Sequence, residues 1–192
     1  MNLKDYKDEF KKIVYSNDWF MEVLQTVRKC NPPNWYVGAG VIRNIVWDHL
    51  HHYNYQTPVK DIDVAFFDEN DLRPERDQEV QNQLQAIQPE ILWEATNQAS
   101  VHLWFENYFG YPVSSLKSSE EAIATWPETV TCIGVRLLDN DSLKIEAPFG
   151  FDDLFNMILR RNPSRLTIDL FRKRYQEKQI MKKWPKVKII DN

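Results

Sequence analysis

Apolar residues recur along the chain at two spacings, and each spacing predicts one kind of secondary structure. Recurrence at every third or fourth position is typical of a helix that buries one face, whereas alternation is typical of a strand. Helices are predicted from Asn17 or Asp18 to about Lys29, over about 40–50, over 72–88, from Ser118 or Ser119 to about Trp126, and from Phe151 onward with breaks at 162–163 and 184–185. Strands are predicted over 35–37, 60–67, 91–95, 100–106, 131–138 and 142–147.

This order of elements predicts a mixed α+β fold. We expect residues 1–155 to form its core and residues 156–192 to form a basic helical extension that packs on the core. With 192 residues, of which 43% are hydrophobic and 27% charged, the chain is long enough to bury a substantial core.

Composition also bears on where the protein works. No apolar run approaches the roughly 18 residues that a membrane span needs, and the polar start over residues 1–5 argues against a leader peptide. Two cysteines, Cys30 and Cys132, make neither a disulfide framework nor a zinc-binding pattern. We therefore expect a cytoplasmic protein without a membrane partner.

Charge is divided unevenly between the two parts of the chain. Residues 156–192 contain 11 Lys and Arg against 3 Asp and Glu, a net charge of +8, and residues 1–155 have a net charge of −12. The basic segment, which also contains Phe171, Tyr175 and Trp184, predicts either contact with nucleic acid or a solvated basic helix. The helical spacing of Phe171 and Tyr175 favours a position of these two rings against the core.

Two aspartates on one strand are the first sign of chemistry. Asp61 and Asp63 are two positions apart, so their side chains share one face of the strand, whereas Ile62 and Val64 point into the core. Two adjacent carboxylates repel each other unless a cation lies between them. Oxygen ligands of this kind suit Mg²⁺ or Mn²⁺, which orient and neutralise substrate phosphates.

A small-residue turn precedes the aspartates. Gly38, Ala39 and Gly40 lie between a predicted strand and a predicted helix, and glycines let a backbone approach phosphate oxygens closely. The free N–H groups at the start of a helix favour anions. Arg43, about one turn into the helix, could add a bidentate phosphate contact.

Together these motifs support a family resemblance. Residues 37–43 followed by 60–64 resemble the signature of the polymerase-beta nucleotidyltransferase superfamily and are similar to the glycine–arginine helix and Asp-x-Asp strand of tRNA CCA-adding enzymes. From about Trp35 to Pro185 the chain resembles a bacterial nucleotidyltransferase-like family. The further motifs of that resemblance are Asn97, 101–104, 147–150 with 152–154, and 160–163.

The resemblance implies a small mixed sheet flanked by helices and an activity that transfers a nucleotidyl group from an NTP to an acceptor. By the same resemblance, Gly38, Ala39 and Gly40 would form the nucleotide-binding turn, and Arg43 would contact the triphosphate. Asp61 and Asp63 would bind two divalent ions, one activating the acceptor hydroxyl and the other holding the leaving pyrophosphate. The acceptor is left open among small molecules, proteins and RNA.

The superfamily has a third acidic residue, and the sequence offers three candidates for its position. Glu94 lies on the first strand predicted after the aspartates, His102 on the next, and Glu146 on the late hairpin. If none of them completes the site, the chain would be a catalytically inactive module that binds nucleotide or RNA. The interval from Gly40 to Asp61 further predicts an inserted loop over 51–58.

Overall fold

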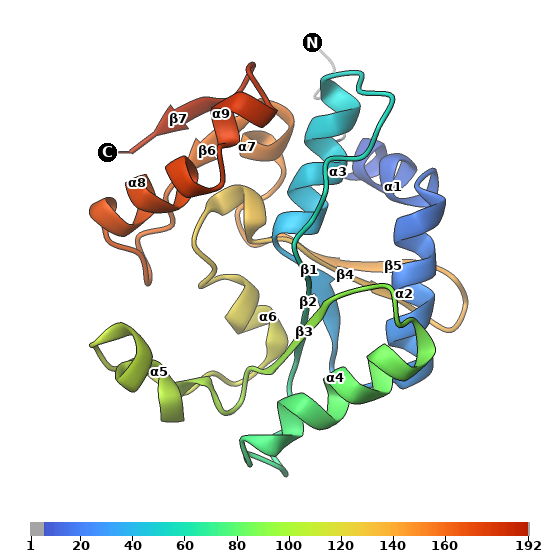
Figure 1. Cartoon of the computed structure of the whole chain (residues 1–192), viewed down its shortest axis with the longest axis vertical. Coiled ribbons are helices and arrows are strands. Elements are labelled where there is room, and N and C mark those ends of the chain that lie inside the picture. The colour runs from blue at the N-terminus through green and yellow to red at the C-terminus, as the bar shows by residue number, and fades with distance from the viewer. Residues whose placement is uncertain (1–5, 192) are drawn as a thin grey trace.

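The computed structural model describes residues 6–191; residues 1–5, whose polar sequence argued against a leader, and Asn192 lie outside the described residues. The elements follow one another from an N-terminal helical pair to a C-terminal helical segment (Figure 1). The helices are α1 (Tyr6–Tyr15), α2 (Asp18–Cys30), α3 (Gly40–Leu50), α4 (Glu75–Ile87), α5 (Val101–Phe109), α6 (Ser119–Ile123), a 3₁₀ turn (Thr129–Thr131), α7 (Asp152–Phe155), α8 (Ile168–Glu177) and α9 (Ile180–Lys183). The strands are β1 (Tyr36–Gly38), β2 (Ile62–Phe66), β3 (Trp93–Asn97), β4 (Gly134–Leu137), β5 (Leu143–Glu146), β6 (Ile158–Arg160) and β7 (Lys188–Ile190).

Five strands form a small mixed sheet in the order β3-β2-β1-β4-β5. The β2–β3 pair is parallel, and β1 pairs antiparallel with both β2 and β4. The predicted hairpin is β4–β5, with Val135 opposite Ile145. This arrangement confirms the predicted α+β class with a small mixed sheet flanked by helices.

One face of the sheet forms the main core together with α2 and α4. Phe20, Leu24 and Leu84 from these helices pack in the same buried cluster as Ile62 and Val64. Helix α2 begins where its sequence predicts, because the Asn17 side chain accepts a hydrogen bond from the Phe20 amide. Since successive side chains on a strand point to opposite faces, Asp63 is directed to the other face of the sheet.

The predicted strand over 100–106 is wrong, because this segment is the helix α5. Val101 and Phe105, four positions apart, are buried, whereas Leu103 and Trp104 between them are exposed. An apolar run this short fits either structure, and burial at a spacing of four shows that a helical face packs here. Gly110, with φ of 83°, ends the helix in a left-handed conformation.

The helical pattern predicted from Phe151 onward, with breaks at 162–163 and 184–185, is also wrong in part. Ile158–Arg160 is a strand, β6, which pairs in parallel with β7 near the C-terminus. A three-residue strand is stabilised by its partner, and that partner lies too far along the chain for local spacing to predict it. In the part of the chain that the structure describes, no helix is long and apolar enough to cross a membrane.

A buried carboxylate connects the C-terminal segment to the core. Asp48 of α3 accepts hydrogen bonds from the indole N–H of Trp184 at 2.7 Å, from the Thr57 amide at 2.7 Å and from the Thr57 hydroxyl at 2.6 Å. The Trp184 ring also lies edge-on against Trp47. Asp48 therefore joins α3, the 51–58 loop and the segment that contains α8 and α9.

We predict that Asp48→Ala lowers the free energy of unfolding by about 3 kcal/mol, because it leaves three buried donors without an acceptor. Urea denaturation followed by tryptophan fluorescence measures this loss. Asp139→Ala, at an exposed position, is the control and should change stability by less than about 0.5 kcal/mol. Equal stability of the two variants would contradict this role of Asp48.

Candidate active site

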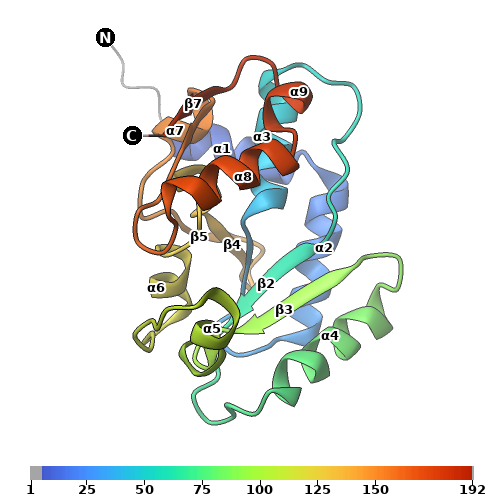
Figure 2. The ribbon, with the colours of Figure 1, turned by 60° about the vertical axis from the view of Figure 1, so that its left-hand side comes forward.

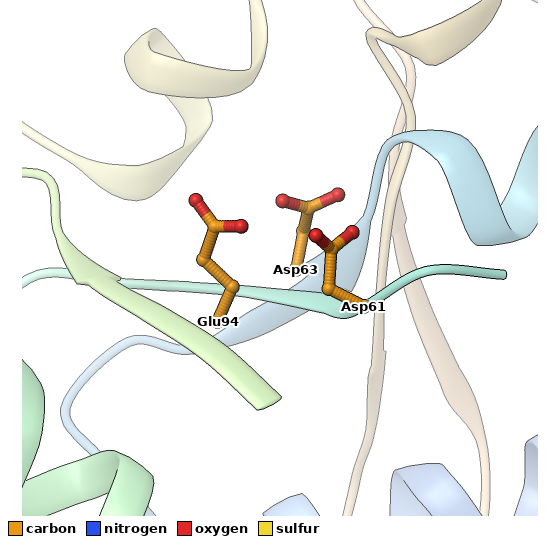
Figure 3. A group of neighbouring side chains, drawn as sticks. All are labelled: Asp61, Asp63 and Glu94. Atoms are coloured by element: carbon orange, nitrogen blue, oxygen red, sulfur yellow. The ribbon is translucent and has the colours of Figure 1, made fainter. Parts of the chain in front are cut away.

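Three carboxylates from two neighbouring strands meet on the face of the sheet opposite α2 and α4. Asp63 of β2 is paired in register with Glu94 of β3, and Asp61 directly precedes β2. Each of the three side chains offers one oxygen, and these oxygens all lie within 4.8 Å of one another. Figure 3 shows the three carboxylates pointing the same way from the two strands. The predicted shared face of Asp61 and Asp63 is confirmed.

The electrostatics of this cluster fit a divalent cation. Burial, together with the neighbouring charges of Glu94 and Asp61, raises the pKa of Asp63 to about 7. Burial and the charge of Asp61 also raise the pKa of Glu94. Lys60 lies 3.6 Å from Asp61, but its side chain is 89% exposed and so compensates little of this charge. A divalent cation would neutralise the repulsion that the three carboxylates build up.

The predicted turn lies beside the carboxylates, and the backbone of its middle residue, Ala39, is strained. Ala39 has φ of 59° and ψ of −124°, a conformation that residues with a side chain rarely adopt. Gly38 is required for a different reason, because a Cβ there would lie 2.6 Å from the Ile133 carbonyl oxygen and from the Trp126 ring. A Cβ at Gly40 would meet only Arg43, at 3.8 Å. The turn therefore leaves open space above the start of α3.

Arg43 of α3 is buried in the wall of the same cavity. Its guanidinium lies 5.6 Å from the ring centre of Trp47 and 5.3 Å from that of Trp184, and it donates to the Asn44 side chain. Its Nε has no hydrogen-bond partner among residues 6–191. Burial lowers the pKa of Arg43 to about 10, so the group still carries its charge at neutral pH.

A cavity of about 570 Å³ brings these parts together. The carboxylates, Ala39, Gly40 and Arg43 line it, as do residues from the C-terminal segment, for which the sequence predicted either contact with nucleic acid or a solvated basic helix. Those residues are Arg174, Glu177, Lys178 and Lys183. Arg174 and Lys178 are four positions apart, a spacing that places both on one face of α8, but the sequence does not reveal which surface this face meets.

The other two candidates for the third acid lie outside the cluster. His102 is on α5, and its Nδ1 is buried with no hydrogen-bond partner in the described part of the chain. Glu146 is the last residue of β5, at the far edge of the sheet from β3, where it pairs with Gly134. Neither residue lines the cavity. Of the three candidates, Glu94 is the one that the fold places beside Asp61 and Asp63.

The sheet and its flanking helices define a polymerase-beta-like nucleotidyltransferase fold, as the resemblance predicted. A protein solved by NMR and described as revealing a CCA-adding enzyme head domain aligns with a TM-score of 0.80 and 26% identity over 96% of both chains. A CCA-adding enzyme solved in complex with CTP shares the fold at a TM-score of 0.52 and 12% identity; the match covers 99% of this chain and 44% of that one.

The family can also be assigned from sequence. A family model described as nucleotidyltransferase matches residues 25–189, so the chain belongs to this nucleotidyltransferase family. No curated protein sequence matches the chain.

We predict that the affinity of the protein for Mn²⁺ rises about tenfold per pH unit below about pH 7 and levels off above it. The reason is that the ion must displace the proton that the raised pKa of Asp63 retains. The raised pKa of Asp63 also means that the free energy of unfolding of the metal-free protein falls as the pH rises from 3.8, the ordinary pKa of an aspartate, to about 7, because the unfolded chain ionises first, and levels off above it.

Calorimetric titration with Mn²⁺ between pH 5.5 and pH 8.5, a range of about three units around the raised pKa, measures the dependence. Asp63→Asn should remove it, and Glu146→Gln should leave both affinity and slope unchanged. An affinity independent of pH in the wild-type protein would contradict the prediction.

Proposed function

We propose that the protein catalyses metal-dependent transfer of a nucleotidyl group from an NTP to an acceptor, with release of pyrophosphate. The observation that supports this most strongly is the cluster of Asp61, Asp63 and Glu94 in a cavity that also contains the start of α3. The cavity volume is within the range of about 300–1,000 Å³ that small-molecule sites occupy. The acceptor stays open among small molecules, proteins and RNA.

In this proposal, the three carboxylates hold Mg²⁺ or Mn²⁺. When bound, such ions neutralise the charge of phosphates and activate an acceptor hydroxyl. Glu94 takes the position of the third acid in preference to His102 and Glu146, because it alone of the three lies with Asp61 and Asp63. A complete set of three acids favours an enzyme over the alternative of a catalytically inactive binding module.

The start of α3 would hold the phosphates of the nucleotide. Its first N–H groups have no partner within the helix and carry the positive end of the helix dipole. Gly40 adds no side chain to obstruct an approach, and Ala39 and Gly40 line the cavity. Arg43 keeps its positive charge, and its buried guanidinium lies against two indole rings. This guanidinium would attract the same phosphates. Gly38 would contribute indirectly by allowing Trp126 to pack against the turn.

Asp61→Ala tests the proposal. We expect it to weaken Mn²⁺-dependent NTP binding by at least about tenfold and to abolish transfer, because one ligand of the ion is lost. Stability should be retained, since the change removes a charge from a repelling group. Calorimetry with each of the four NTPs, with and without Mn²⁺, and release of pyrophosphate are the readouts.

Glu146→Ala is the matched control, because it also removes a carboxylate from a strand terminus but lies outside the cavity. It should bind NTP as the wild-type protein does. NTP binding that needs neither metal nor Asp61 would overturn the proposed function and favour the inactive binding module.

A further inference from the structure

Helix α8 forms the wall of the cavity that lies across from the carboxylates. In both views, α8 lies apart from β2 and β3 (Figures 1 and 2). Arg174 and Lys178 of this segment line the cavity together with Asp63 and Glu94. The cavity thus has carboxylates on the sheet and, on the C-terminal segment, a wall where the cations Arg174, Lys178 and Lys183 outnumber the one carboxylate Glu177.

The guanidinium of Arg174 is fixed in place by a buried acid. Its Nε donates to Glu128 at 3.0 Å, and the Glu128 side chain is only 3% exposed. Glu128 also accepts a hydrogen bond from the Thr131 hydroxyl at 3.0 Å. Because one side of the guanidinium is held by this carboxylate, its remaining N–H groups keep a fixed direction for a second acceptor.

Lys178 has a different environment, because it forms no ion pair with a carboxylate of the described residues. Among residues 6–191, no ion pair within 4.0 Å involves its ammonium group. Desolvation and the positive charges of Arg43 and Arg174 lower its pKa, and the negative charges of Glu128 and Asp63 act in the opposite direction. Three cations from two parts of the chain, α3 and α8 with its C-cap, therefore act on one another in this cavity, and an anion would relieve their repulsion.

The other cations of α8 do not form such a site. Arg172 is paired with Asp191 at 2.7 Å, and Lys173 lies 3.8 Å from Glu177 on an exposed surface. These two cations of α8 therefore have carboxylate partners, whereas Lys178 forms no ion pair among the described residues. Lys178 lines the cavity, as does Lys183.

We propose that Arg174 and Lys178 form a polyphosphate-binding wall, which binds the phosphates of the nucleotide between α8 and the carboxylate cluster. This inference rests on the proposed function and adds to it the residues that recognise the polyphosphate chain. Glu128 is a positioning residue, because it orients Arg174 without facing the phosphates itself. The C-terminal segment thereby supplies part of the substrate site in the same chain.

The test compares two lysines of the same segment in the full chain. Lys178→Ala should weaken binding of inorganic tripolyphosphate and of Mg²⁺-NTP about tenfold each, because one charged contact is lost, and should leave binding of the nucleoside alone unchanged. Lys173→Ala removes the same charge from the outer surface and should change either affinity by less than about twofold. Lys178→Arg should restore most of the lost affinity. Calorimetry measures the affinities, and thermal denaturation shows that the variants are folded.

Two results would overturn the proposal. One is equal affinity for tripolyphosphate in the Lys178→Ala and Lys173→Ala variants, which would leave Lys178 a structural cation at the end of α8. The other is a loss of nucleoside binding as large as the loss of NTP binding, which would place the base at this wall.

Failure of the proposed function gives a different pattern. In that case Asp61→Ala leaves NTP binding unchanged while Lys178→Ala still weakens binding of tripolyphosphate. The polyphosphate-binding wall would then stand without the transferase.

Discussion

The repulsion between three carboxylates on two neighbouring strands is the constraint on which the rest of the site depends. The parallel register of β2 and β3 sets Asp63 beside Glu94, and the pleat of the strand sets Asp61 on the same side. Burial makes this repulsion costly, as the raised pKa of Asp63 near 7 shows. A protein retains such an arrangement where a bound cation compensates the negative charge of the carboxylates. The start of α3 and the cationic wall lie next to the carboxylates and suit the phosphates that such a cation would bring.

The C-terminal segment completes this site through packing in the core. Trp184 donates to the buried Asp48 and lies against Arg43, so one side chain both anchors the segment and holds a cation of the cavity wall. The same attachment brings α8 over the cavity, where Glu128 orients Arg174. In the proposed function, stability and substrate binding are thus coupled at α3, because Asp48 and Arg43 belong to one helix.

Local patterns predicted the parts of the site that lie close together in sequence. The turn over 38–40, Arg43 and the Asp61–Asp63 pair follow from spacing within single elements. Glu94 could not be selected over His102 and Glu146, because the choice depends on which residue of β3 is in register with Asp63. His102 was placed on a strand, since an apolar run of this length fits either structure. The position of Lys178 was missed because it depends on long-range packing of the C-terminal segment.

Anomalous diffraction from crystals of the protein grown with Mn²⁺ and a non-hydrolysable NTP analogue tests the central claim most directly. We expect Mn²⁺ peaks at the oxygens of Asp61, Asp63 and Glu94, with the phosphates of the analogue between these ions, the start of α3 and helix α8. An analogue bound in the cavity with no Mn²⁺ at these carboxylates, or bound elsewhere on the chain, would contradict the account.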